Sequence, residues 1–136
     1  MKTIDVLDKS FVPFLSAAKI EERIQALAAT LNYDYKDKNP LFVAILNGSF
    51  MFAADMYKHI NIDSQITFIK LASYKGTTST GNVITAIGLE ENLKDRHIIV
   101  VEDIVDTGKT LHTFLPQLFE SRLALPKEER KWQGFN

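Results

Sequence analysis

The stretch Ile98-Ile99-Val100-Val101-Glu102-Asp103-Ile104-Val105-Asp106-Thr107-Gly108-Lys109-Thr110-Leu111 decides the fold of this chain. Its first four residues are β-branched, which predicts a buried strand. Its last residues predict the start of a helix. Between them lie Glu102, Asp103 and Asp106, followed by small hydrogen-bonding residues and a glycine. A strand that runs through acids into Thr-Gly-Lys-Thr indicates an α/β fold with a site for a phosphorylated, polyhydroxylated ligand.

The residue types in this stretch suit such a ligand. Gly108 lets a phosphate approach the main chain, and Thr107 and Thr110 offer hydroxyl groups. The N–H groups that begin the following helix favour an anion. Glu102 and Asp103 follow the strand, at the edge where open α/β sheets bind ligands, and carboxylates there suit sugar hydroxyls or a magnesium ion.

A simpler interpretation of the same stretch is a helix entry. Asp106 or Thr107 would then be the N-cap and the other acids would only be solvated. The whole run taken together favours the ligand site. A P-loop is excluded, because that motif needs a glycine five residues before Gly108, where this chain has Asp103.

The composition bounds the remaining possibilities. The chain has 136 residues, of which 46% are hydrophobic and none is cysteine, and its formal net charge is −1. We therefore expect one domain with a sizeable core and no disulfide or cysteine-ligated metal. The charge gives no case for nucleic acid, and no apolar run or signal peptide indicates a membrane or export. The expected location is the cytoplasm.

Hydrophobic periodicity predicts the other elements. Helices are expected at about 17–31, after Ser16 as N-cap, at 50–57, and at about 109–118, where Pro116 would kink or end the helix; the region 119–125 is a further helix candidate. Strands are expected at 41–46, 65–71, 83–87 and 97–101, the last as the central strand, with a short edge strand at 11–15.

A second strand–glycine–helix junction lies at Asn47-Gly48-Ser49. The apolar run 41–46 before it predicts a strand buried on both faces. The N–H groups of this junction would hold another anion, although a tight turn with Ser49 as N-cap is the interpretation that the junction alone favours.

The segment from Ser73 to Gly81 is small, polar and bounded by glycine. Such a segment beside a site is a candidate lid. A plain hairpin connection to the next strand explains the same residues equally well.

Together these motifs resemble the type I phosphoribosyltransferases, in particular their hypoxanthine/guanine branch, over roughly residues 5 to 118. The resemblance implies a mostly parallel twisted sheet flanked by helices. It also implies transfer of a 5-phosphoribosyl group from phosphoribosyl pyrophosphate (PRPP) to hypoxanthine or guanine in purine salvage, with Mg²⁺ as cofactor and a homodimer or homotetramer as the assembly.

The resemblance also implies roles for individual residues. Glu102 and Asp103 would hold the ribose hydroxyls directly or through Mg²⁺, and Asp106 would act as general base or acid beside the purine N7. The 5′-phosphate would bind to Thr107, Gly108, Lys109 and Thr110. Pyrophosphate would bind to Asn47 and Gly48, where many members of the family have a basic residue in place of Asn47. Ser73 and Tyr74 would open the lid.

The C-terminal part departs from this pattern. We expect a phosphoribosyltransferase-like domain at 1–118 and a divergent charged tail at 119–136, in which the family's next strand, purine-contacting lysine and stacking aromatic are not found. The chain is thus expected to be a truncated or altered member. The alternatives are a non-catalytic remnant that binds PRPP or a nucleotide without a purine pocket, and an RNA-binding regulatory domain, against which the net charge argues. The sequence does not distinguish the purines.

Overall fold

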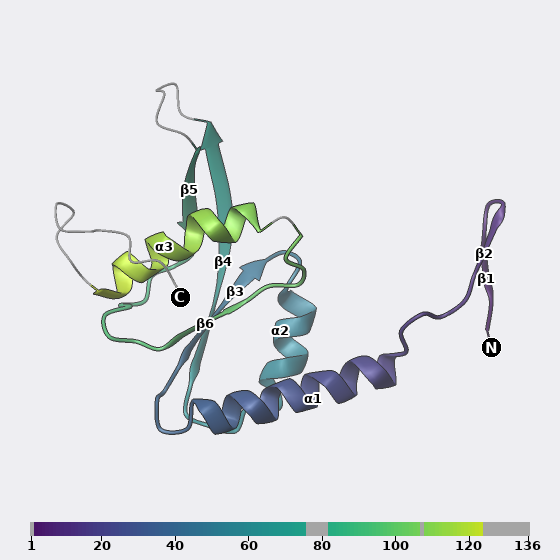
Figure 1. The fold of residues 1–136 in the computed structure, drawn as a ribbon, viewed down its shortest axis with the longest axis horizontal. Helices are drawn as coiled ribbons and strands as arrows, with labels where there is room; N and C mark the ends of the chain where they lie inside the picture. The colour runs from purple at the N-terminus through teal and green to yellow at the C-terminus, as the bar shows by residue number, and fades with distance from the viewer. Residues whose placement is uncertain (1, 76–81, 107, 124–136) are drawn as a thin grey trace.

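The computed structural model describes residues 2–75, 82–106 and 108–123 (Figure 1). Its elements, in chain order, are β1 (Ile4–Val6), β2 (Lys9–Phe11), α1 (Ala17–Asp34), β3 (Leu41–Leu46), α2 (Phe50–Tyr57), β4 (Gln65–Lys75), β5 (Asn82–Ile87), β6 (Ile98–Val101) and α3 (Lys109–Leu123). No helix in these ranges is long and apolar enough to cross a membrane.

The main sheet has the strand order β5-β4-β3-β6. Strands β4, β3 and β6 run parallel, and β5 is antiparallel to β4. This confirms the predicted, mostly parallel α/β sheet. The predicted central position of β6 is wrong, because β3 lies between β4 and β6, and β6 forms the edge of the sheet within the described residues.

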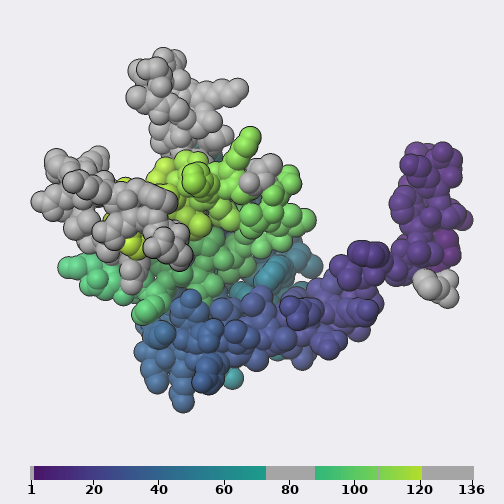
Figure 2. Space-filling model, viewed as in Figure 1, coloured from purple at the N-terminus to yellow at the C-terminus, as the bar shows by residue number. Residues whose placement is uncertain are grey.

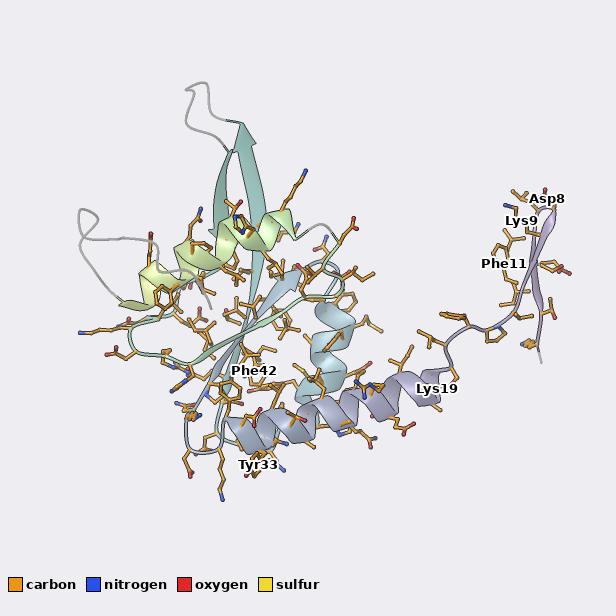
Figure 3. All side chains as sticks on the ribbon, in the orientation of Figure 1. Asp8, Lys9, Phe11, Lys19, Tyr33 and Phe42 are labelled. Carbon is orange, nitrogen blue, oxygen red and sulfur yellow. The ribbon has the colours of Figure 1, made fainter. Side chains whose placement is uncertain are left out.

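The two faces of β3 are buried by different helices. Phe42 and Ala44 lie on the face that α1 and α2 cover, where they form one core with five further residues: Ile24, Ala28, Ala53, Met56 and Val101. The Phe42 ring meets the Tyr57 ring edge-on, with 5.5 Å between the ring centroids. Figure 3 shows Phe42 between the sheet and the two helices. This explains why the run 41–46 has no polar residue.

The alternate residues of β3 face the other way. Leu41, Val43 and Ile45 form the second core with Ile69, Leu93, Phe114 and Leu118, and thus pack under α3 and the loop before β6. Because side chains alternate along a strand, one continuous apolar run serves both cores. The prediction of a strand buried on both faces is confirmed.

Two helices extend beyond their predicted ends. Helix α1 begins as predicted, since the Ser16 hydroxyl accepts a hydrogen bond of 3.2 Å from the Lys19 N–H, but it continues to Asp34. Helix α3 continues through Pro116 to Leu123 instead of ending near Leu118. Proline removes one helical hydrogen bond, but Phe114 and Leu118 on either side of it are buried in the core and hold the helix in place.

The N-terminal strands form a separate two-stranded hairpin. Strands β1 and β2 pair antiparallel, with Ile4 opposite Phe11, so the predicted edge strand at 11–15 is wrong except at its first residue. Pro13 and its neighbours instead form an irregular connection to α1. The hairpin stands away from the body of the molecule in Figures 1 and 2, and every residue in it is exposed.

Candidate functional site

Two strand–helix junctions meet at one edge of the sheet. Strands β3 and β6 are parallel neighbours, with Ala44 opposite Val101. The chain therefore leaves both strands at their shared carboxyl edge, into Asn47-Gly48-Ser49 before α2 and into the loop 102–108 before α3. Open α/β sheets bind ligands at this edge, so the fold brings together the two junctions that the sequence singled out.

The first junction is a tight turn held by its own backbone. The Ser49 N–H donates to the Ile45 carbonyl at 3.3 Å, and the Phe50 N–H donates to the Asn47 carbonyl at 3.3 Å. Asn47 and Gly48 are exposed, whereas Ser49 is fully buried. The peptide bond between Leu46 and Asn47 is cis. The turn thus presents two adjacent exposed residues to solvent at the sheet edge.

The carboxylate of Asp103 packs directly on Gly48. A Cβ atom built on Gly48 would lie 2.7 Å from Cγ of Asp103, which no real side chain tolerates. Gly48 does not have a positive φ, so the absence of a side chain there is required by this close approach and not by the backbone conformation. The two junctions are therefore in contact through Asp103 of the second loop and Gly48 of the first.

Glu102 and Asp103 differ in environment although they are neighbours. Glu102 is half-buried and Asp103 is exposed. Burial raises the pKa of Glu102, and the adjacent Asp103 carboxyl adds to this, while a hydrogen bond from the Asp103 N–H at 3.0 Å opposes it. The pKa of Asp103 is lowered, chiefly because the Ile104 N–H donates to its carboxylate at 2.7 Å. The charge of the pair is thus concentrated on Asp103, beside Gly48.

The rest of the second loop is open to solvent. Ile104 is 75% exposed, Val105 is 59% exposed, and Asp106 is exposed as well. Apolar side chains this exposed at a sheet edge can contact a flat, apolar ligand surface such as that of a base. Asp106 lies at the far end of this exposed run, where its carboxylate is accessible to such a ligand.

Helix α3 begins after a glycine with a left-handed backbone. Gly108 has a φ of +79°, and its carbonyl accepts a hydrogen bond of 2.8 Å from the His112 N–H. Gly108 therefore lies directly before the first residue of α3, two residues after Asp106. A residue with a side chain would be strained at this φ. Lys109 and Thr110 are exposed in the first turn of α3, and Thr107 lies outside the described residues.

The acids do not form a metal centre by themselves. Among the described residues there is no group of three or more His, Asp or Glu side chains that could hold a metal ion. Mg²⁺ is commonly bound by only one or two carboxylates, with water and substrate phosphates completing its shell. Glu102 and Asp103 fit that pattern, because they offer adjacent carboxylates at an open edge.

Ser73 and Tyr74 lie in a strand and not in a loop. They belong to β4, where they are paired with Ile84 and Val83 of β5. The segment that connects β4 to β5 therefore begins after Lys75, which corrects its predicted start and confirms the alternative of a hairpin connection. Residues 76–81 of the candidate lid lie outside the described residues.

The sequence did not reveal the part that Ser49 plays. It predicts Ser49 as an N-cap, and Ser49 does precede α2, but its side chain makes no capping hydrogen bond. Its hydroxyl instead donates to the Ile45 carbonyl at 2.5 Å. A serine after a strand and a glycine is compatible with either partner, so no signal in the sequence distinguishes them.

Comparison with known proteins gives one family. The model of the phosphoribosyl transferase domain matches residues 14–124. A hypoxanthine-guanine-xanthine phosphoribosyltransferase of Tritrichomonas foetus is 42% identical over 99 residues, which are 73% of this chain and 54% of that protein. A hypoxanthine-guanine phosphoribosyltransferase of Streptococcus mutans is 41% identical over 110 residues, which are 80% of this chain and 61% of that protein.

Solved structures agree with the sequence relatives. A hypoxanthine phosphoribosyltransferase from Staphylococcus aureus superposes with a TM-score of 0.71 at 33% identity, covering 82% of this chain and 61% of that one. A hypoxanthine-guanine phosphoribosyltransferase from Bacillus anthracis has a TM-score of 0.68 at 33% identity and covers 79% and 61%. The chain thus spans between a half and two thirds of the length of these relatives.

Proposed function

Because the chain belongs to the phosphoribosyl transferase domain family, we propose that it transfers the 5-phosphoribosyl group of PRPP to hypoxanthine or guanine. The products are the purine nucleotide and pyrophosphate, and the reaction serves purine salvage. The relatives named above are enzymes that carry hypoxanthine or guanine in their names. They favour catalysis over the alternative of a non-catalytic nucleotide-binding remnant.

One observation carries this proposal more than any other, namely the contact between Asp103 and Gly48. PRPP has a ribose with two hydroxyl groups between a 5′-phosphate and a pyrophosphate. A site for it needs a carboxylate for the hydroxyls directly beside a turn for the pyrophosphate. Asp103 and the Asn47–Gly48 turn supply these two features in contact with each other.

The remaining assignments follow the order of groups along PRPP. Glu102 and Asp103 bind the ribose hydroxyls. The 5′-phosphate binds at Thr107, Gly108, Lys109 and Thr110, where the first turn of α3 offers N–H groups and hydroxyls to an anion. Asn47 and Gly48 bind pyrophosphate. In support, Gly108 has the left-handed backbone that lets a phosphate approach the main chain.

The chemistry requires these groups at these places. The bond between the anomeric carbon and the pyrophosphate oxygen breaks, and its electron pair leaves with pyrophosphate. The purine nitrogen donates the pair that forms the new bond, and the purine loses one proton. The turn at Gly48 stabilises the negative charge that develops on pyrophosphate. Asp106, exposed at the end of its loop, accepts or returns the proton at the purine N7.

The proposed reaction uses Mg²⁺ as its cofactor. Glu102 and Asp103 would hold it together with oxygens of PRPP, and it would neutralise charge on the leaving pyrophosphate. The position of Asp103 supports this, because its carboxylate and a pyrophosphate would otherwise repel each other across Gly48. Ser73 and Tyr74, near the end of β4, would lead into the segment that closes over the site and excludes water.

The proposal also covers the location and the assembly of the protein. The protein would act in the cytoplasm as a homodimer or homotetramer. Size-exclusion chromatography with light scattering measures the assembly directly.

A direct assay tests the activity. The full chain is incubated with PRPP, Mg²⁺ and hypoxanthine or guanine, and inosinate or guanylate is measured by chromatography. We expect Mg²⁺-dependent formation of nucleotide and pyrophosphate in equal amounts. If no nucleotide forms under conditions in which a full-length relative is active, this chain does not catalyse the reaction.

A further inference from the structure

The hydroxyl of Ser49 is fully buried and points away from the helix that it precedes. A serine at an N-cap usually accepts a hydrogen bond from an N–H group in the first turn of its helix. The Ser49 hydroxyl instead donates to the carbonyl of Ile45, the residue four positions before it, at 2.5 Å. The Ser49 N–H donates to the same carbonyl at 3.3 Å. Two hydrogen bonds from one residue thus tie the end of the turn to strand β3.

This arrangement leaves the first turn of α2 without a cap. Within the part of the chain that the structure describes, no hydrogen bond satisfies the N–H groups of Met51 and Phe52. Such N–H groups at a helix start accept an anion as partner. Had the Ser49 hydroxyl capped the helix, it would have occupied the place that these N–H groups offer to a ligand.

The same two bonds also determine where Gly48 lies. Gly48 is the residue between Asn47 and Ser49, and the carboxylate of Asp103 lies against it. Asn47 and Gly48 are exposed, and the carboxylate of Asp103 packs on Gly48 from the second loop. Their position depends on what anchors the turn at each end, which is β3 on one side and buried Ser49 on the other.

We propose that Ser49 is a positioning residue for pyrophosphate: its buried hydroxyl holds the Asn47–Gly48 turn in the binding conformation and keeps the start of α2 open to the anion. This inference rests on the proposed function. Ser49 does not itself touch the ligand. It acts through the turn, and the 5′-phosphate site at the start of α3 does not depend on it.

The test compares two ligands on one variant. Ser49→Ala removes the hydroxyl, and isothermal titration calorimetry measures the affinity for pyrophosphate and for guanosine 5′-monophosphate, each with Mg²⁺. We expect pyrophosphate to bind about tenfold more weakly, because the unanchored turn must be ordered on binding. Guanosine monophosphate carries no pyrophosphate, and its affinity should change by less than about twofold.

A matched control separates positioning from general loss of stability. Thr67 is also a buried hydroxyl residue, 8% exposed, on the neighbouring strand β4 opposite Val43 and away from the carboxyl edge. Thr67→Val removes its hydroxyl from the same sheet, and both affinities should stay unchanged. Ser49→Cys, whose thiol fills the same space but is a weak donor, should behave like Ser49→Ala and replaces it if that variant does not fold.

The outcomes are distinct. Selective loss of pyrophosphate affinity in the Ser49 variants supports the inference. Equal weakening of both ligands, or no change in either, overturns it. If the unaltered chain binds neither ligand, the proposed function itself fails and the inference falls with it.

Discussion

The two junctions at the carboxyl edge occupy equivalent places in the fold but are built in opposite ways. The β3–α2 junction has three residues, no charge and a buried serine that ties it to its strand. The β6–α3 junction has seven residues, carries three acids and exposes apolar side chains. The β3–α2 junction suits a ligand group that backbone N–H groups alone can bind. The β6–α3 junction suits a ligand group with hydroxyls or a metal ion, which carboxylates bind.

The difference follows from the position of each strand. Strand β3 is covered on both faces and paired on both edges, so its end is fixed and a short turn suffices. Strand β6 has a neighbour on one side only within the described residues, and three of its four residues are half-buried. A longer loop can leave such a strand. The rigid junction thus supports the more open one through the contact of Gly48 with Asp103.

Phe42→Ala should have the largest effect and should damage both junctions together. Phe42 is fully buried in the strand from which the first junction leaves and beside which the second begins. Truncating a buried phenylalanine costs about 3–5 kcal/mol in the free energy of unfolding. Urea denaturation measures this. Phe68→Ala is the control, because Phe68 is 41% exposed and should cost far less; equal losses would contradict the described core.

Glu102→Gln combined with Asp103→Asn should break the second junction alone. Two charged hydrogen-bonding groups are lost, so the affinity for PRPP with Mg²⁺ should fall by about 100-fold or more in a calorimetric titration. The control is Glu90→Gln with Asp95→Asn, which removes the same charge from exposed acids outside the site. Unchanged PRPP affinity in the site variant would refute the assignment of these acids.

Gly48→Ala should break the contact between the junctions. The added methyl group overlaps the Asp103 carboxylate, so we expect about 1–3 kcal/mol of lost stability and weaker pyrophosphate binding. Adding Asp103→Ala removes the overlapping group and should restore stability. The double-mutant cycle is therefore predicted to be strongly non-additive, and additive thermal stabilities would show that the contact is absent.

The smallest expected effect is the pH dependence of stability, to which Glu102 and Asp103 contribute with opposite signs. The raised pKa of Glu102 means that the folded protein holds a proton there that the unfolded chain releases, so this contribution to stability falls as pH rises from the ordinary glutamate pKa of 4.5 to the folded value. The lowered pKa of Asp103 means that its contribution is lost as pH falls from the ordinary aspartate pKa of 3.8.

Single variants separate these two contributions. At pH 7, Glu102→Gln should raise the melting temperature slightly, because it removes a half-buried charge, and Asp103→Asn should lower it. Thermal denaturation of both variants at pH 7 and pH 4 measures the effect. Shifts of the same sign in the two variants at pH 7 would contradict the described environments.

The sequence predicted most strands and helices of the main sheet because the signals for them are local. The apolar run Leu41–Leu46 predicted a strand buried on both faces, and the two cores confirm it. The same reasoning placed the strand predicted at 97–101 in the centre of the sheet, which is wrong. Four β-branched residues indicate a buried strand but carry no information on how many strands lie beside it.

The sequence located the two junctions but not the contacts that they make. Glycine followed by Ser49 marked the first junction, yet the choice of the Ser49 hydroxyl between helix and strand depends on the backbone of the turn. Similarly, Ser73 and Tyr74 look like loop residues because they are polar or isolated, and it is their pairing with β5 that places them in β4. The contact of Asp103 with Gly48 joins residues far apart in sequence and has no local signal.

The hairpin of β1 and β2 has a consequence for hydrogen exchange. It is exposed throughout and stands off the body of the molecule, and a two-stranded hairpin alone is marginally stable in water. Its amide protons are expected to exchange by local fraying, at a rate set by the hairpin itself. The amides of β3 exchange only when the whole sheet opens. Hydrogen exchange would therefore report two independent opening equilibria in one chain. A ligand bound at the sheet edge would slow the exchange of the β3 amides and leave the exchange of the hairpin amides unchanged.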